Sequence, residues 1–239
     1  MLPALITALV LAHGAGWHQV SVTKHRGATA ATLSYSARPA NVTDLRAVRL
    51  VVRLHGRTVI DRMLRTWHQG TPTLSLRDVW GEPSPEALVG VEACGNRCSF
   101  ELFIGLPARG RVVSHDFEIQ FSPITFQRRD GTVDMIGRDG RFFCEFADCA
   151  SSTTPVQALA VGRAGNGIVD ISRTRRDLLV RDARSMWKGY LQERKSKLYQ
   201  PLGTLVPYCA DEYRLGVTAY CDRVLKPAVK RQLTAWGYR

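Results

Sequence analysis

The hydrophobic pattern of this chain changes its period near residue 170, and this change limits the fold more than any other feature. Before it, Val48, Leu50 and Val52 alternate with two arginines and a valine, a period of two that is typical of a strand with one buried face. After it, apolar residues recur every three or four positions, as in an amphipathic helix. We therefore expect an α+β protein, in which an antiparallel β-rich domain, sandwich or partial-propeller-like, spans residues 16–172 and a helical C-terminal segment spans residues 173–239.

Short apolar runs separated by Gly, Pro and Asp continue the strand pattern through most of the first part of the chain. A hairpin is expected at His55-Gly56-Arg57, between the alternating run and the apolar residues 58–60. Because no helical stretch separates these runs, an antiparallel sheet system is favoured over a parallel one. The other predicted strands are 32–35, 73–76, 87–91, 99–104, 116–121, 132–136, 142–146 and 156–161.

Three helices are expected after residue 173. In the first, one face is apolar and the other is charged. The apolar face comprises Leu179, Ala183, Met186, Trp187, Tyr190 and Leu191. The second helix is expected over 201–215 and the third over 217–236, with Pro227 as a kink or a boundary. The aromatic residues Trp187, Tyr190, Tyr213 and Tyr220 have the spacing of core residues, and a ligand-binding box is the alternative interpretation.

The N-terminus has the form of an export signal. Leu2 to Val10 is a short uncharged apolar run, and small residues follow it, so residues 1–15 are interpreted as a signal peptide. No Lys or Arg precedes the run, and a buried first strand is the alternative. Since no later stretch offers the roughly 20 apolar residues of a membrane helix, we expect a secreted or extracellular protein, envelope-associated at most, with no membrane span.

Cysteine usage agrees with export. The six cysteines fall into three local pairs, which is typical of a disulfide framework in an oxidising compartment. They are Cys94, Cys98, Cys144, Cys149, Cys209 and Cys221. Zinc is the competing interpretation, but the neighbours of these cysteines are not further ligands of the kind that a structural zinc site needs. Disulfides are therefore expected, with the connectivity left open.

Positive charge is concentrated in the last third of the chain. The formal net charge is +12, and residues 160–239 hold 16 Lys or Arg against 7 Asp or Glu. Such a surface attracts polyanions, and a solubility role is the alternative. The absence of a basic and aromatic sheet signature argues against nucleic acid as the partner. The candidate polyanion-binding residues are Arg173, Arg175, Arg176, Arg181, Arg184, Lys188, Arg194, Lys195 and Lys197.

Two loops resemble a motif of secreted proteins. The stretch Leu76-Arg77-Asp78-Val79-Trp80-Gly81-Glu82-Pro83-Ser84-Pro85-Glu86-Ala87-Leu88-Val89 is similar to the FG-GAP or VCBS-like motif, and a second copy ends in Asp130-Gly131-Thr132-Val133-Asp134. Further segments, among them 138–142 and 181–183, resemble the secreted actinobacterial proteins that carry this motif. The resemblance implies a recognition module in which the motif serves as scaffold.

The same resemblance implies a calcium loop, in which carboxylate oxygens converge on the ion. Asp78, Glu82 and Glu86 would be its ligands. Trp80 replaces a ligand and Pro83 replaces the turn glycine. We therefore expect a degenerate turn held by packing, and no cofactor.

No sequence motif for catalysis is present. The chain lacks a Gly-x-Ser-x-Gly elbow, a His-Glu-x-x-His pair, a phosphate-binding loop and a dinucleotide turn. The best acid–base cluster is His115 with Asp116 and Glu118. The leading hypothesis is thus a secreted binding or cell-envelope structural protein, whose partner is an envelope polyanion or another protein. The alternative is a hydrolase of cell-wall polymer or glycan that uses the pair Asp116 and Glu118 or the pair Glu82 and Glu86.

Overall fold

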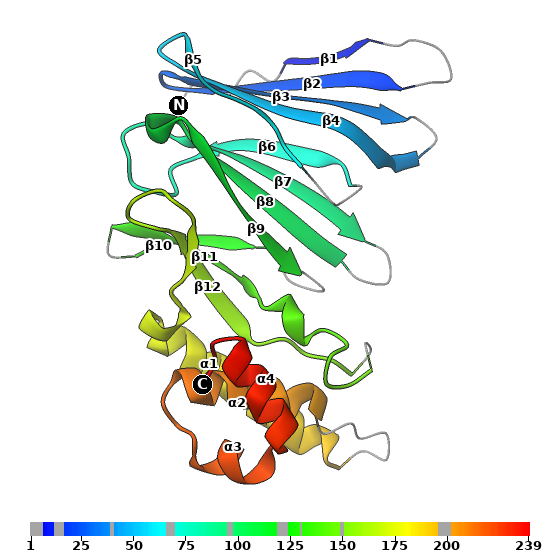
Figure 1. Ribbon diagram of the computed structural model, residues 1–239, viewed down its shortest axis with the longest axis vertical. Helices are drawn as coiled ribbons and strands as arrows, with labels where there is room; N and C mark the ends of the chain where they lie inside the picture. Colours follow the sequence, from blue (N-terminus) through cyan, green and yellow to red (C-terminus); the bar gives the residue numbers. More distant parts are fainter. Residues whose placement is uncertain are drawn as a thin grey trace. The chain divides into compact units, whose positions relative to one another are not determined.

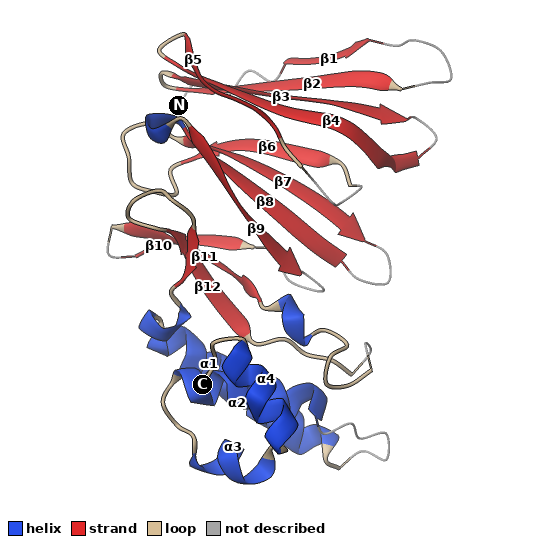
Figure 2. Cartoon of the chain, in the orientation of Figure 1, coloured by secondary structure: helices blue, strands red, loops and turns tan. Residues whose placement is uncertain are grey.

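The fold is α+β and combines antiparallel sheets with C-terminal helices (Figures 1 and 2). The computed structural model describes residues 7–11, 17–38, 41–65, 70–94, 98–118, 124–129, 131–148, 151–195 and 202–239. The chain divides into two compact units. The sheet unit comprises Met1–Phe117, Phe126–Asp134 and Ala160–Val169, and the helical unit comprises Glu118–Thr125, Met135–Leu159 and Asp170–Arg239.

Two antiparallel sheets form most of the sheet unit. The first has the order β1-β2-β3-β4-β5 and the second the order β6-β7-β8-β9. The first contains β1 (Thr7–Leu11), β2 (His18–Arg26), β3 (Thr29–Arg38), β4 (Asn41–Leu54) and β5 (Arg57–Met63). The second contains β6 (Pro72–Arg77), β7 (Glu86–Cys94), β8 (Cys98–Leu106) and β9 (Arg111–Glu118), with the short helix η1 (Pro107–Arg109) before β9.

The inner faces of these two sheets share one hydrophobic core, so the sheet unit is a sandwich. Leu33 of β3 and Leu50 of β4 pack in the same cluster as Val89 of β7 and Phe103 of β8. The alternation in β4 explains this arrangement: Val48, Leu50 and Val52 are 2%, 0% and 0% exposed. The predicted period-two strand is therefore confirmed.

The predicted hairpin is a two-residue turn. His55 and Gly56 both have positive φ, at 50° and 78°, and Leu54 pairs with Arg57 across the turn. A pair of positive φ angles is the geometry whose twist matches that of the flanking strands. His55 has a backbone conformation that is uncommon for residues other than glycine.

Residues at the N-terminus form a strand in the structure. Thr7–Leu11 is β1 and pairs with β2 in antiparallel register, for example Leu9 with Ser21. This is the arrangement of the alternative interpretation of the apolar N-terminal run. Residues 1–6 and 12–16 lie outside the described part of the chain, and export itself stays a prediction.

A third antiparallel sheet has the order β10-β11-β12-β13. Its strands are β10 (Thr125–Arg129), β11 (Thr132–Arg138), β12 (Val156–Val161) and β13 (Ile168–Asp170). Strand β12 is buried along its whole length. The chain crosses between the units within β11 and β12, because each of these strands contributes residues to both.

The expected strand at 142–146 is wrong. Gly140–Phe142 is the short helix η2, and a turn follows it. Asp139 causes this, because its side chain accepts a hydrogen bond from the backbone N–H of Arg141 and so favours a turn. Cys144 then has φ 57°, which reverses the chain. Phe142 is buried in the helical core and not on a sheet face.

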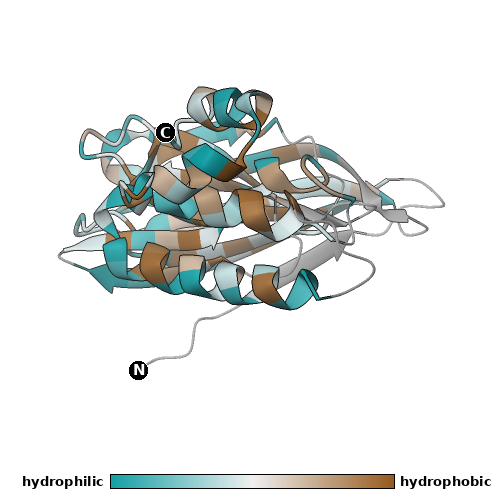
Figure 3. Ribbon diagram, turned by 90° about the horizontal axis from the view of Figure 1, so that it is seen from below, coloured by the Kyte–Doolittle hydropathy of each residue, from teal (hydrophilic) through white to brown (hydrophobic). Residues whose placement is uncertain are grey.

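The helices gather around a second hydrophobic core. The helix η3 (Ser172–Thr174) leads into α1 (Arg176–Glu193), and α2 (Leu202–Arg214), α3 (Ala219–Val224) and α4 (Pro227–Ala235) follow. The third predicted helix is two helices, because Pro227 begins α4 and so forms a boundary. In Figure 3, hydrophilic and hydrophobic residues alternate along the helices, as amphipathic packing requires.

A disulfide joins α2 to α3. Cys209 and Cys221 are bonded, with Cα atoms 5.5 Å apart. These two cysteines lie in the second and third helices that the sequence predicts. Cys144 is also disulfide-bonded, and no cysteine among the described residues is free. Cys149, and the side chains of Cys94 and Cys98, lie outside what the structure describes. No helix in the described ranges is long and apolar enough to span a bilayer.

Candidate functional site

Helix α1 presents basic side chains on one face and apolar side chains on the other. Leu179, Ala183, Met186 and Tyr190 are buried. The exposed residues Arg181, Arg184, Lys188 and Lys195 follow each other at three-, four- and seven-residue spacing, which places them on one side of a helix. We call these four the α1 basic stripe; Lys195 lies just beyond the helix end.

Two residues of the α1 basic stripe have no partner in the protein. Among the described residues, neither Arg184 nor Lys188 takes part in an ion pair or a hydrogen bond. Arg181 contacts Asp177 at 3.5 Å across one helical turn, and both side chains are more than half exposed. An exposed pair of this kind contributes little to stability. The stripe is therefore available to a ligand.

The other predicted polyanion-binding residues are used differently. Arg173 donates hydrogen bonds to the backbone carbonyls of Gly237 and Tyr238, and Arg176 donates to the carbonyl of Leu215. These two side chains connect α1 and its approach to other segments of the helical unit. Arg175 is half-buried and has a partner.

Two further predicted polyanion-binding residues, Arg194 and Lys197, follow the end of α1. The guanidinium of Arg194 lies 5.7 Å from the ring centre of Tyr190, an arrangement that covers the ring. Lys197 lies outside the described residues. The α1 basic stripe comprises those four of the nine predicted residues that are exposed along one side of α1, and their role in binding stays a prediction.

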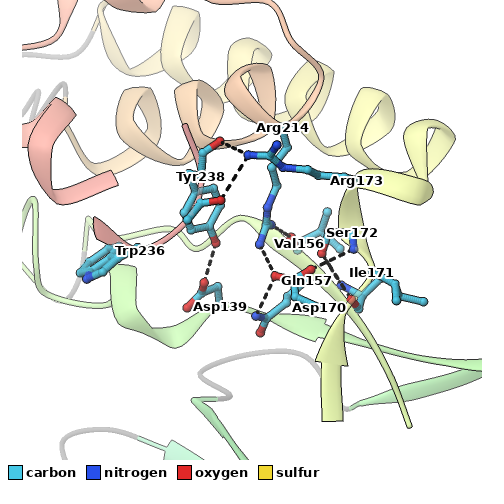
Figure 4. A network of polar contacts seen from close by, with 12 residues as sticks. Asp139, Val156, Gln157, Asp170, Ile171, Ser172, Arg173, Arg214, Trp236 and Tyr238 are labelled. Atoms are coloured by element: carbon cyan, nitrogen blue, oxygen red, sulfur yellow. Dashed lines mark hydrogen bonds and ion pairs between the residues drawn. The ribbon is translucent and has the colours of Figure 1, made fainter. Parts of the chain in front are cut away.

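Behind α1, a buried arginine joins three elements of the helical unit (Figure 4). Arg214 of α2 has a side chain that is 4% exposed. Its guanidinium donates to the carbonyl of Val156 at 2.9 Å and to Asp170 at 2.7 Å, and it lies 3.9 Å from the ring centre of Tyr238. Because every face of the guanidinium has a protein partner, Arg214 is structural.

A second buried carboxylate holds the last residues of the chain (Figure 4). The hydroxyl of Tyr238 donates to Asp139 at 2.5 Å, and Arg141 forms an ion pair with the same carboxylate. Burial opposes ionisation of Asp139, but the Arg141 hydrogen bond and charge hold its pKa below the usual range. Burial and the charge of Asp139 raise the pKa of Tyr238. This cluster fixes a neutral tyrosine against a charged aspartate.

Asp182 lies on the buried side of α1 and is fully satisfied. Both of its oxygens accept hydrogen bonds from Nη1 of Arg138, at 2.6 and 2.8 Å, and one also accepts from the backbone N–H of Val156. Arg138 donates in addition to the carbonyl of Thr154. The pair Arg138 and Asp182 thus fastens α1 to β11 and β12.

Asp211 of α2 is the exception in this network. It is 0% exposed, and neither of its oxygens has a hydrogen-bond partner within normal distance. Burial raises its pKa well above the usual value, and the nearby charge of Asp182 raises it further. Ionisation of Asp211 is therefore disfavoured in the folded protein, because burial and the charge of Asp182 oppose a second carboxylate charge here.

A pocket of about 290 Å³ opens in the helical unit beside the Arg138 and Asp182 pair. It lies between α1 and the strands of the third sheet. Its lining residues are Thr125, Ile136, Gly137, Arg138, Val156, Leu178, Arg181 and Asp182. Arg181 belongs to both this pocket and the α1 basic stripe.

The predicted calcium ligands lie in one turn of the sheet unit, each with a different protein partner. Asp78 accepts from the backbone N–H of Gly81 and from Arg128, and Glu82 lies 4.0 Å from Arg109. Glu86 is 1% exposed and accepts from the backbone N–H of Val79. Protein donors therefore occupy both oxygens of Asp78 and one oxygen of Glu86, whose other oxygen is buried without a partner among the described residues.

Glu86 is also more buried than Asp78 and Glu82. Desolvation raises its pKa, although the backbone hydrogen bond from Val79 acts in the opposite sense. Among the described residues, no three His, Cys, Asp or Glu side chains form a group that could hold a metal. The second predicted loop contains Asp134, which is buried and has a partner; Asp130 lies outside the described residues.

The structure describes the predicted catalytic residues only in part. Glu82 and Glu86 belong to the turn just described. The ring of His115 packs edge-on against Phe117 at 4.8 Å, and the side chains of Asp116 and Glu118 lie outside what the structure describes. The hydrolase alternative therefore stays a prediction.

The half-buried aromatic cluster differs from the predicted one by one member. Trp187 contacts Tyr190, Tyr208 and Tyr220, with ring centres 4.9 to 5.3 Å apart. Tyr213 is buried elsewhere in the helical core and donates to Asp222. Because these rings pack on each other, the cluster belongs mainly to the core between the helices.

The sequence interpretation missed the four charged residues that organise the helical unit. They are Arg138, Asp182, Asp211 and Arg214. A signal was present for Asp182, because its position on α1 falls among Leu179, Ala183 and Met186, and an acid on an apolar face needs a buried partner.

Comparison with family models, curated proteins and solved structures finds no match to this chain.

Proposed function

We propose that this protein is an exported binding protein of the cell envelope, which holds an anionic polymer through the α1 basic stripe. The observation that supports it is that the basic residues of the helical unit fall into two groups, one in internal contacts and one exposed to solvent. Some are consumed by internal contacts, as Arg214 and Arg173 are, while Arg184 and Lys188 face solvent without partners. A purely structural role does not require this aligned set.

The spacing of the stripe suits a linear polyanion. Arg181 and Lys188, with Arg184 between them, are seven residue steps apart on α1, and at about 1.5 Å per step this is roughly 10 Å. Charges on a solvated surface interact over about one Debye length, which is about 10 Å at 0.1 M salt. The stripe therefore acts as one charged patch, and binding through it must weaken as salt rises.

Export and the partner's location rest on the apolar N-terminal run, the cysteine usage and the resemblance to secreted FG-GAP-like proteins. Outside the cell, the available polyanions are wall polymers, acidic glycans and anionic lipid surfaces. That no described helix is long and apolar enough to span a membrane is not an argument for export. The stripe alone supports the choice of an anionic partner.

The test is co-sedimentation of the oxidised protein with purified cell-envelope material at about 0.05 M and 0.5 M salt. The variant changes Arg181, Arg184 and Lys188 to Gln. A basic residue near an anionic surface contributes about 1 kcal/mol, so we expect the variant to bind roughly 10- to 100-fold more weakly at low salt. The unchanged protein should be released at high salt.

A matched variant controls for net charge. Arg223, Lys226 and Arg231 are exposed residues of the same unit, and their change to Gln removes the same three charges. We expect this variant to retain most of the binding. Equal loss in both variants would show that net charge and not the stripe attracts the polymer, and retention that salt does not affect would overturn the proposal.

A further inference from the structure

The pocket beside α1 combines an oriented guanidinium with an apolar wall. Arg138 is held by three hydrogen bonds that all use Nη1, two to Asp182 and one to the carbonyl of Thr154. Among the described residues, Nη2 and Nε of Arg138 have no acceptor, and the Arg138 side chain is 31% exposed. Since Arg138 lines the pocket, it offers unused N–H donors from a fixed position.

Arg181 supplies a second guanidinium from the other side of the pocket. Its side chain is 65% exposed, and its contact with Asp177 is a long 3.5 Å. It can therefore turn toward a ligand at little cost in free energy. A single guanidinium can bind a carboxylate or phosphate group with two parallel hydrogen bonds.

The acid in the pocket does not oppose such a ligand. Asp182 is 7% exposed in its side chain, and its oxygens already accept three hydrogen bonds. Its charge is compensated by Arg138, and Arg181, whose acidic partner Asp177 does not line the pocket, adds a further positive charge there. Burial and the charge of Asp182 also disfavour ionisation of the nearby Asp211.

The remaining lining limits the size and character of the ligand. Ile136, Val156 and Leu178 form an apolar wall, and Thr125 adds a hydroxyl. A volume of about 290 Å³ lies at the lower end of the range for small-molecule pockets, about 300 to 1,000 Å³. This space fits one sugar or one glycerol unit with a single acidic group.

We propose that this pocket binds the carboxylate or phosphate group of a small organic anion between Arg138 and Arg181. The inference deepens the proposed function and rests on it for the source of the anion: because Arg181 also belongs to the α1 basic stripe, the pocket receives one acidic unit of a polymer that lies along α1. The pocket supplies selectivity, and the stripe supplies affinity.

The test uses four small probes with the full oxidised chain. They are galacturonate and glycerol 3-phosphate, with galactose and glycerol as their uncharged counterparts. Titration is followed by isothermal calorimetry and by chemical-shift changes at β11 and α1. We expect saturable binding of at least one anion, and no binding of either uncharged probe. Galacturonate binding would point to an acidic glycan, and glycerol phosphate binding to a phosphate-linked polymer.

Three variants separate the pocket from the stripe. Arg181→Gln should weaken binding of the small anion at least 10-fold, and Leu178→Trp, which fills the pocket without changing charge, should abolish it. Arg184→Gln is the matched control, since it removes one charge from the same helix outside the pocket. It should leave small-anion binding unchanged while weakening retention by envelope material.

The outcomes distinguish this inference from the proposed function. Failure of both anions to bind, or binding that Leu178→Trp does not affect, overturns the pocket, and salt-sensitive retention that the stripe variant loses would still support the proposed function. Small-anion binding without envelope retention supports the pocket and overturns the proposed function. Circular dichroism melts of each variant confirm that the fold is retained.

Discussion

At the scale of single residues, the helical unit shows two ways to bury charge. Arg214 and Asp182 each have a full set of partners, so their burial is compensated. Asp211 is equally buried without a hydrogen-bond partner. A carboxyl in such a place avoids the cost of an unpaired charge by keeping its proton. The stability of the protein must therefore depend on the protonation of Asp211.

We expect Asp211→Asn to make the protein less sensitive to rising pH. The pKa of Asp211 is raised in the folded state, so above the ordinary aspartate pKa of about 3.9 the unfolded chain binds fewer protons at this site. Stability then falls as pH rises from about 4 through the raised pKa. Asparagine removes this dependence, and the difference in melting temperature between variant and unchanged protein should increase with pH.

Asp177→Asn is the matched control, because Asp177 is an exposed acid in the same unit. Its melting temperature should follow that of the unchanged protein across the same pH range. Thermal melts at pH 4, 6 and 8 decide the matter. If Asp211→Asn changes the melting temperature equally at all three, the pKa of Asp211 is not raised in the folded state.

At the scale of elements, the sequence predicts what depends on local pattern and misses what depends on partners. The alternation around Leu50 and the helical spacing around Met186 predict β4 and α1, because each requires only a periodic apolar face. Phe142 misleads, because an apolar residue near other apolar residues looks like a strand, whereas Asp139 turns the chain.

The candidate site follows the same division. Arg184 and Lys188 are predicted correctly as exposed, because a charged face of an amphipathic helix is a local property. Arg138 and Arg173 are not separable from them by sequence, because their roles are decided by acceptors far along the chain, at Asp182 and at Tyr238. The pocket could not be predicted, since it is formed by residues from β10, β11, β12 and α1.

The disulfide between α2 and α3 should contribute strongly to the helical unit. It closes a loop of 12 residues, and the chain-entropy model gives about 3 kcal/mol for a loop of this length. Helix α3 has only six residues and is too short to be stable alone. We expect the double variant Cys209→Ala with Cys221→Ala to melt roughly 5 to 10 °C lower.

Melting is followed by the helical signal at 222 nm under oxidising conditions. Addition of a reducing agent to the unchanged protein also breaks the disulfide of Cys144, so the variant is the cleaner measurement. A variant that melts at the same temperature as the unchanged protein would show that packing of Leu205, Tyr213 and Leu225 in the helical core holds α3 without the covalent link.

At the scale of the whole molecule, the net charge of +12 combines two populations of basic residues. One is turned inward and compensated, as Arg138, Arg141 and Arg214 are. The other, which includes the α1 basic stripe, remains solvated and repels itself. Net charge far from zero keeps a protein soluble but destabilises its compact state. Composition cannot separate these populations, although salt screens the solvated one much more than the compensated one.

We therefore expect sodium chloride to raise the melting temperature of the free protein while it lowers retention by envelope material. Between about 0.05 M and 0.5 M salt, screening shortens the range of repulsion among exposed charges, whereas the buried pairs are screened much less. The two measurements use one protein preparation, and chloride is chosen because sulfate also stabilises proteins by exclusion from their surface. A rise in melting temperature of a few degrees alongside loss of retention would show that the polymer is released from a folded protein by loss of electrostatic attraction. A fall in melting temperature over the same range would mean that salt releases the polymer by unfolding the helical unit. The salt dependence of retention would then give no support for binding through the α1 basic stripe.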